Sequence, residues 1–312
     1  MPTVHVLGPL ACDRVYHVDR LPGRDEKAFA RAYRDVVGGP PLWVAAHLAA
    51  WGVPVQVQSV IGNDDAGRIV AAELDRRGIG TAGITMPAGL RTATPVVIVD
   101  RTGERAIVID AIPEAGLRQI GAAAEPVAGD WVVSNLFHPE PVSDVVARAR
   151  SAGAATVVDL ELPEVERFGF ARAMEAVGGA DIVVTNGQFL GWWRPHGRSE
   201  QLTAAGACAR GLSDGRRTAI VTLGAGGAVL ADERTLLHVT APAVSAVNTT
   251  GAGDTFAAGL VRSRMEGAAI GDAVRAGVAA ASRFVAGLST DWGDVSAAAA
   301  TLDAREMSEE AP

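Results

Sequence analysis

The chain has 312 residues, of which 48% are hydrophobic and 21% are charged, a composition typical of a folded globular protein. Its formal net charge of −8 argues against nucleic acid or an anionic membrane as the main partner, because either would require a basic face. The sequence has no unbroken run of about 18 apolar residues, so no membrane span is expected. Only two distant cysteines, Cys12 and Cys208, are present, which favours a cytoplasmic protein without disulfides.

Short, almost entirely apolar segments alternate with alanine-rich amphipathic segments along most of the chain. The apolar segments are typical of strands buried on both faces of a parallel sheet. The alternation predicts an α/β fold, a doubly wound and mostly parallel sheet flanked by helices, in one domain over residues 1–312. The expected strands are Val4–Leu7, Val55–Val60, Trp131–Ser134, Thr156–Asp159, Ile182–Thr185 and Thr218–Thr222. The expected helices are Leu42–Ala50, Ala66–Arg77, Val142–Ser151, Leu202–Gly211 and two within Thr255–Ala286.

Two β-rich segments, Lys27–Val36 and Thr94–Asp110, interrupt this alternation. The second has the pattern of a hairpin, with a turn at Arg101–Glu104 between β-branched runs. We expect the inserted segments, roughly 13–36 and 90–111, to form a small β-sheet that acts as a lid over a site. A simple edge hairpin is the alternative. An open sheet exposes unpaired edges, so we also expect a homodimer formed through the lid.

The most informative stretch reads NTTGAGD and follows an apolar segment that we expect to be a strand ending at Val247. Gly251 and Gly253 allow a sharp turn and a close approach of a ligand to the backbone, and a helix is expected to begin near Asp254. The main-chain amides here, including that of Ala252, would form an anion hole for a phosphoryl group. The Asp254 carboxylate could then accept the proton of an attacking hydroxyl.

Glycine-rich turns before helices are common, however, and Asp often caps such a helix without any catalytic role. The chain has no Walker A pattern, and no Gly-x-Gly-x-x-Gly follows a strand with an acidic partner. A P-loop or a common dinucleotide site is therefore disfavoured.

In its sequence motifs, the chain resembles the ribokinase-like (PfkB) carbohydrate kinases. The stretch around Asp254 is similar to the C-terminal signature of that family, and other family landmarks follow in the expected order over nearly the whole chain. They are Gly38-Gly39 before a helix, Gly62-Asn63-Asp64-Asp65-Ala66-Gly67, Asn186 at the end of a strand, and Thr222-Leu223-Gly224-Ala225-Gly226-Gly227.

The resemblance implies a role for each matching residue. Asp254 would be the general base, and Gly251, Ala252 and Gly253 would form the anion hole. Substrate would be held by a set that includes Asp13, Gly38 and Gly39. The family uses Mg-ATP, and the residues implied to contact the nucleotide are Asn186, Thr222, Gly224, Gly227 and Thr250.

Four positions depart from the family pattern. Asn248 stands where the family usually has Asp, which makes activation by a monovalent cation such as K⁺ doubtful. Phe189 stands where the family has a glutamate that helps to organise magnesium, so the metal ligands are left unassigned. Glu161 replaces an Asn on the phosphate side, and Trp43 lies where an Asn usually contacts sugar. These changes indicate an unusual substrate.

The N-terminal part is similar to the sulfofructose kinase branch, in which a lid lysine holds the substrate anion, a role that Lys27 could take. A lysine on an exposed strand is otherwise simply solvated. The companion arginine of that branch corresponds to Phe137 here, and Phe137 and Trp43 could instead line a more apolar substrate pocket.

We therefore predict an ATP-dependent kinase that phosphorylates an alcohol group of a sugar or sugar derivative. The alternatives are a nucleoside kinase of the same fold and a binding protein that has kept the fold without catalysis. An NAD-dependent oxidoreductase lacks its fingerprint.

Overall fold

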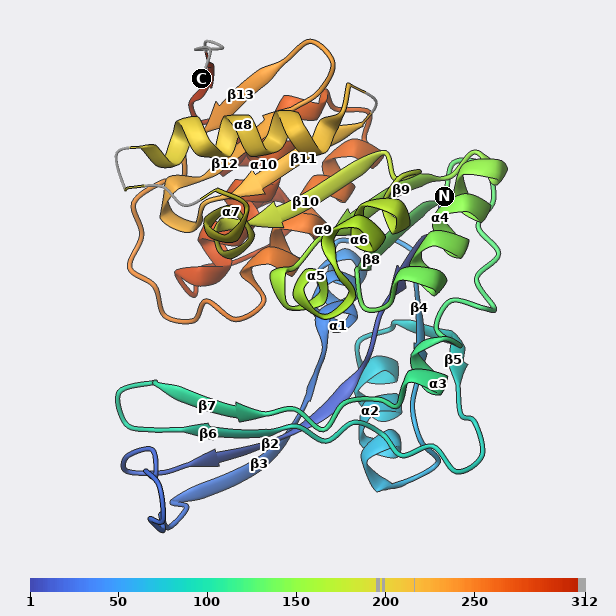
Figure 1. The fold of residues 1–312 in the computed structure, drawn as a ribbon, viewed down its shortest axis with the longest axis vertical. Coiled ribbons are helices and arrows are strands. Elements are labelled where there is room, and N and C mark those ends of the chain that lie inside the picture. Colours follow the sequence, from blue (N-terminus) through green and yellow to red (C-terminus); the bar gives the residue numbers. More distant parts are fainter. Residues whose placement is uncertain (195–196, 198–199, 216, 308–312) are drawn as a thin grey trace.

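A ten-stranded sheet forms the centre of the molecule (Figure 1). The computed structural model describes residues 1–194, 197, 200–215 and 217–307. The strand order is β14-β13-β12-β11-β10-β9-β8-β1-β4-β5, and the strands from β11 to β5 run parallel. These parallel strands are β1 (Val4–Leu7), β4 (Val55–Val60), β5 (Gly80–Thr85), β8 (Trp131–Asn135), β9 (Ala155–Asp159), β10 (Ile182–Asn186) and β11 (Thr218–Thr222). The antiparallel strands are β12 (Ala228–Ala231), β13 (Leu236–Val239) and β14 (Ala304–Glu306).

Helices cover both faces of the sheet, which confirms the predicted doubly wound architecture. Alternate residues of a strand point to opposite faces, so Val4 and Val6 of β1 join one hydrophobic core and Leu7 joins the other. The first core includes α1 (Pro40–Ala50), α2 (Asp65–Arg76), α9 (Ala252–Met265), α10 (Ile270–Val285) and α11 (Trp292–Ala299). The second includes α3 (Glu114–Leu117), α4 (Pro139–Ala152), α5 (Leu162–Phe168), α6 (Phe170–Ala176), α7 (Gly187–Trp193) and α8 (Gln201–Ser213).

A separate four-stranded sheet projects from one end of the main sheet (Figure 1). We call it the small sheet. Its order is β3-β2-β6-β7, built from β2 (Ala11–His17), β3 (Ala32–Gly38), β6 (Val96–Val99) and β7 (Arg105–Val108). The predicted hairpin is confirmed, since the amide of Asp100 donates to the Glu104 carbonyl across the turn at 3.0 Å. The segment Lys27–Val36 is a strand only from Ala32 onward, so Lys27 lies in the loop between β2 and β3.

The stretch before α9 differs from the sequence expectation. Residues 241–247 form no strand, and Val247 instead donates its amide to the carbonyl of Val285, at the end of α10, at 2.8 Å. The segment before the turn is therefore held against the end of α10 and is not a strand of the main sheet.

Within the part of the chain that the structure describes, no helix combines the length and the apolar character needed to cross a bilayer.

Candidate active site

A left-handed turn at Gly251 introduces α9 and sets the position of Asp254. Gly251 is the N-cap residue, with φ +88°, a backbone conformation that residues with a Cβ rarely adopt. A Cβ at this position would also lie 3.2 Å from Cγ of Trp43. Because α9 begins at Ala252, Asp254 lies in its first turn, slightly further inside the helix than expected.

Free main-chain amides remain at this helix terminus, as helix geometry requires. The amide of Ala252 donates to the Thr249 carbonyl at 3.3 Å, so it is already partly used. Among the described residues, the amides of Gly253 and Asp254 have no acceptor. With the positive end of the helix dipole, these two amides can hold an anion.

Side chains of α1 and α9 brace the turn from behind. The Thr255 hydroxyl donates to the Gly251 carbonyl at 2.7 Å and lies 3.1 Å from Nε2 of His47. Burial, with a smaller contribution from the charge of Arg77, lowers the pKa of His47 to about 4. His47 is therefore neutral at physiological pH and donates through Nε2, because the Thr255 hydroxyl proton already points to Gly251.

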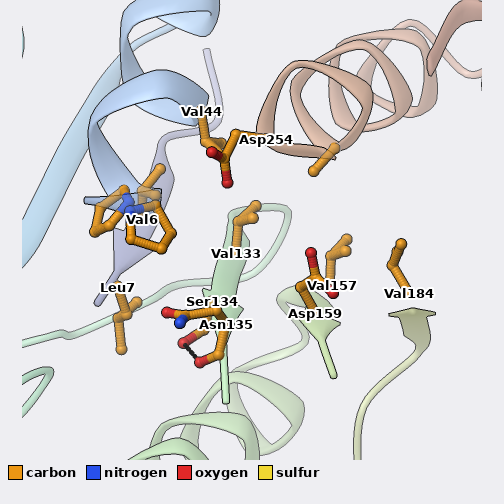
Figure 2. Close-up of a pocket in the computed structure, with 13 residues that line it drawn as sticks. Val6, Leu7, Val44, Val133, Ser134, Asn135, Val157, Asp159, Val184 and Asp254 are labelled. Carbon is orange, nitrogen blue, oxygen red and sulfur yellow. Dashed lines mark hydrogen bonds between the residues drawn. The ribbon is translucent and has the colours of Figure 1, made fainter. Parts of the chain in front are cut away.

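Asp254, Asp159 and Asn135 project into one space at the carboxyl ends of the parallel strands (Figure 2). Asn135 and Asp159 end β8 and β9 and are direct register partners. We call this space the inner cavity. Its volume is about 20 Å³, and apolar side chains such as Val133 and Val157 complete its walls. A space of this size admits a water molecule or one hydroxyl group.

Burial raises the pKa of the carboxyl groups at this site. Burial, followed by the charge of Glu161, raises the pKa of Asp254 to about 8. The pKa of Asp159 is raised by burial and then by the charges of Glu161, Asp254 and Glu164. Burial also raises the pKa of Glu161, although a hydrogen bond from Asn135 opposes this effect. Burial and like charges therefore oppose joint ionisation of these carboxyl groups, and a bound cation would offset that effect.

The polar atoms that lack partners here are hydrogen-bond acceptors. Oδ1 of Asn135, a residue that is 7% exposed, and Oδ1 of Asp159 have no hydrogen-bond partner in the described structure. Buried acceptors without partners cost free energy. They therefore favour a ligand that brings hydroxyl donors or a cation.

A larger space adjoins the inner cavity, with Asp159 and Asp254 lining both. We call it the outer cavity, and its volume is about 580 Å³. It runs along the Gly251 turn, past Glu161, to the ends of β10 and β11. Its lining includes the predicted nucleotide contacts Asn186, Thr222 and Gly224, together with Gly251, Ala252 and Gly253. No lysine or arginine of the described chain lines either cavity.

The predicted nucleotide residues have clear local roles. Asn186 caps α7, accepting the amides of Gln188 and Phe189 at 3.0 and 3.2 Å. Thr222 is its register partner on β11, and a pocket of about 100 Å³ continues past Thr222, Gly224 and Gly227. Gly227 has φ +88°, and a Cβ there would lie 1.9 Å from the Val239 carbonyl, so only glycine fits.

The di-glycine and Asp13 meet where the small sheet joins α1. A Cβ on Gly38 would lie 2.5 Å from Oδ2 of Asp13, so the absence of a side chain makes room for this carboxylate. Gly39 caps α1 with φ +104°. Burial raises the pKa of Asp13.

None of the six predicted substrate residues, Asp13, Gly38 and Gly39 included, lines the inner or the outer cavity. Lys27 is exposed in its loop, and Phe137, 4% exposed, is buried in the second hydrophobic core. Trp43 packs on the rear of the Gly251 turn, with its ring 5.7 Å from that of Phe284. Phe189, which replaces the expected glutamate, is fully buried, so its position cannot present a ligand.

One residue of the site, Asn135, and one hydrogen bond, between Arg105 and Thr250, are not expected from the sequence. Asn135 is not among the predicted site residues, although a polar residue at the end of an apolar strand is a usable signal. Thr250 receives a hydrogen bond from Arg105 of β7, for which the sequence offers no signal. No cluster of three or more His, Cys, Asp or Glu suited to a metal occurs in the described part of the chain.

The comparisons with known proteins agree with this geometry. The family model described as pfkB family carbohydrate kinase matches residues 1–291. An ATP-dependent ribose-1-phosphate kinase from Halopiger xanaduensis is 28% identical over 81% of this chain and 82% of its own length. A ribokinase from Haemophilus influenzae is 25% identical over 90% of this chain and 91% of its own. The structure of Arabidopsis thaliana ribokinase complexed with ribose and ATP superposes with a TM-score of 0.75 at 23% identity, covering 96% and 98% of the two chains. The chain therefore belongs to the pfkB family of carbohydrate kinases and is a sugar kinase.

Proposed function

We propose that this protein transfers the γ-phosphoryl group of ATP to a hydroxyl group of a sugar or sugar derivative, with Asp254 as the general base. The observation that carries the proposal is the position of the Asp254 carboxylate. It adjoins the free amides of Gly253 and Asp254, at the place where the inner cavity meets the outer cavity. The Arabidopsis relative was solved with ribose and ATP, which supports the same pair of ligand classes here.

The arrangement suits in-line phosphoryl transfer. The acceptor oxygen forms the new bond to phosphorus, the bond from phosphorus to the ADP oxygen breaks, and the hydroxyl proton passes to Asp254. The amides at the α9 terminus stabilise charge on the phosphoryl oxygens. A carboxylate whose pKa is raised to about 8 is a stronger base than a solvated one.

Magnesium fits the donor set of the outer cavity. Mg²⁺ is usually bound by one or two carboxylates together with substrate phosphates and water, so a cluster of three protein ligands is not needed. Asp159, with its unpartnered Oδ1, and Glu161 are the carboxylates that would hold it. When bound, the ion would neutralise negative charge on the nucleotide phosphates.

The walls of the site favour an uncharged acceptor rich in hydroxyl groups. The unpartnered Oδ1 of Asn135 can receive a sugar hydroxyl, and the cavities have no lysine or arginine for a phosphorylated or sulfonated sugar within the described residues. Asp13, at the base of the small sheet, would hold further hydroxyls.

The small sheet would act as the lid over the acceptor, and its outer strand would form a homodimer. β7 is an edge strand, and Val108 and the adjacent Ile109 are 66% and 73% exposed. An exposed apolar edge is a ready partner for a second copy. Two buried free cysteines support a reducing, cytoplasmic location.

A coupled assay of ADP formation against a panel of aldoses, ketoses and nucleosides tests the proposal. We expect ADP release that depends on a neutral sugar, with one phosphate added to that sugar by mass spectrometry. Phosphorylation of nucleosides alone would overturn the sugar assignment. ATP binding without transfer to any acceptor would overturn the catalytic one.

A further inference from the structure

A hydrogen bond joins the small sheet to the turn that introduces α9. The guanidinium of Arg105, on β7, donates to the hydroxyl of Thr250, 145 residues away along the chain. In the described structure it is the only hydrogen bond between β7 and residues 248–254. Thr250 directly precedes Gly251, so a cation from the small sheet contacts the turn that carries the free amides.

Strand register places Arg105 on the same face of the small sheet as Asp13. Arg105 pairs with Val99, and Val99 pairs with His17 of β2. Paired residues project to one face, and residues two apart on a strand share it. His17 and Asp13 are four apart, so they lie on that face together with Arg105, whereas Arg14 lies on the opposite face. The contact with Thr250 shows that the face with Arg105 is turned toward the turn before α9, whose residues Thr249 and Gly251 line the outer cavity.

The residues described in the walls of the outer cavity supply no positive charge for an anionic ligand. Asp159, Glu161 and Asp254 line it, and no lysine or arginine of the described residues does. A nucleotide polyphosphate would add further negative charge. Arginine keeps its charge at all relevant pH values and presents a planar set of donors that matches two phosphoryl oxygens.

We propose that Arg105 is the phosphate-binding cation of this kinase and that the small sheet delivers it. Its guanidinium leaves the Thr250 hydroxyl and contacts the terminal phosphoryl group when nucleotide fills the outer cavity. While Arg105 holds the terminal phosphoryl group, the phosphorus–oxygen bond to ADP breaks, the bond to the acceptor forms, and Asp254 takes the acceptor proton. Transfer then depends on closure of the small sheet, which limits hydrolysis of ATP by water.

This inference rests on the proposed function but can fail separately from it. The test compares Arg105→Ala and Arg105→Lys with Arg14→Ala, a matched arginine on the opposite face of the same sheet. Binding of ADP and of a non-hydrolysable ATP analogue, β,γ-imido-ATP, is measured by titration calorimetry, and kcat and KM are measured with the best sugar acceptor.

Arg105→Ala should weaken binding of the imido-ATP analogue about 10-fold and change the affinity for ADP by no more than about 2-fold. The reason is that ADP lacks the terminal phosphoryl group that Arg105 would contact. The kcat of this variant should fall about 10³-fold or more, the lower end of the range that arginine contacts give in phosphoryl transfer. Arg105→Lys should recover part of both losses, and Arg14→Ala should behave as wild type. Equal affinities for the analogue in wild type and Arg105→Ala, or equal losses for ADP and the analogue, would overturn the role of Arg105. Failure of the wild type to bind either nucleotide would instead overturn the proposed function.

Discussion

Asp254 and Glu161 line the same cavity, and the charge of Glu161 is the second cause, after burial, of the raised pKa of Asp254. Asp254 belongs to the first turn of α9, and Glu161 is the N-cap residue of α5. Like charges that share a site disfavour joint ionisation. Glu161, one of the four positions that depart from the family pattern, would thus tune Asp254, the proposed base.

The pH dependence of kcat/KM should reveal this coupling. The base acts in its ionised form, and its pKa lies near 8 in the free enzyme, so kcat/KM should rise with pH and level off above about 8. Glu161→Gln removes one negative charge and should move the rise toward lower pH by roughly one unit. An unchanged profile in Glu161→Gln, measured beside a distant control such as Glu233→Gln, would show that the two carboxylates are not coupled.

Removing the Asp254 carboxylate should lower kcat and, at pH 8, raise the free energy of unfolding. Asp254→Asn should lower kcat by about 10³-fold or more, since loss of a general base removes proton transfer. The pKa of this group is higher in the folded than in the unfolded state, so the wild type loses stability as pH rises from about 4 to about 8. Asp254→Asn should therefore be the more stable protein at pH 8, by on the order of 2 kcal/mol, and the difference should vanish below about pH 4. Chemical denaturation at both pH values measures this.

The sheet could be predicted from the sequence because its strands are short apolar runs that must be buried on both faces. β1 and β8 are buried at every position, which only a covered sheet allows. The glycine turn could also be predicted, because glycine is the residue that most readily takes the positive φ found at Gly251.

Contacts between distant segments could not be predicted in this way. Asn135 lies beside Asp159 only because of the register between β8 and β9. Phe137, two residues on, is buried in the core, and a single sequence does not distinguish these two environments. The same holds for Trp43, whose ring supports the turn from behind.

The turn itself can be tested with two neighbouring glycines. Gly251→Ala would force a Cβ into a left-handed backbone and against Trp43, so it should cost on the order of 1–3 kcal/mol and impair nucleotide binding. Gly253→Ala is the matched control, because no atom lies within 4 Å of its added Cβ and its φ is ordinary. Thermal unfolding of both variants decides the matter, and equal melting temperatures would contradict the described turn.

If the protein dimerises through β7, a charged side chain on that strand should disrupt the dimer. Val108→Lys puts a charge on its exposed edge strand and should shift the protein from dimer to monomer in sedimentation velocity, because lysine on an edge opposes pairing. Val127→Lys is the control, since Val127 is 62% exposed but lies outside the small sheet. A wild type that sediments as a monomer, or a Val108→Lys variant that remains a dimer, would refute dimerisation through this edge.

Asn248 leads to a prediction about monovalent cations. Its Oδ1 accepts the amide of Thr250 at 3.0 Å, so the side chain stabilises the turn while carrying no charge. A neutral amide attracts K⁺ less than a carboxylate does, and we therefore expect kcat/KM in KCl and NaCl of equal ionic strength to agree within about 2-fold. Asn248→Asp keeps an acceptor for the Thr250 amide and adds the missing charge, so this variant should gain a preference for KCl. Strong activation of the wild type by K⁺ would show that main-chain carbonyls alone hold the ion and that the charge at position 248 does not decide cation dependence.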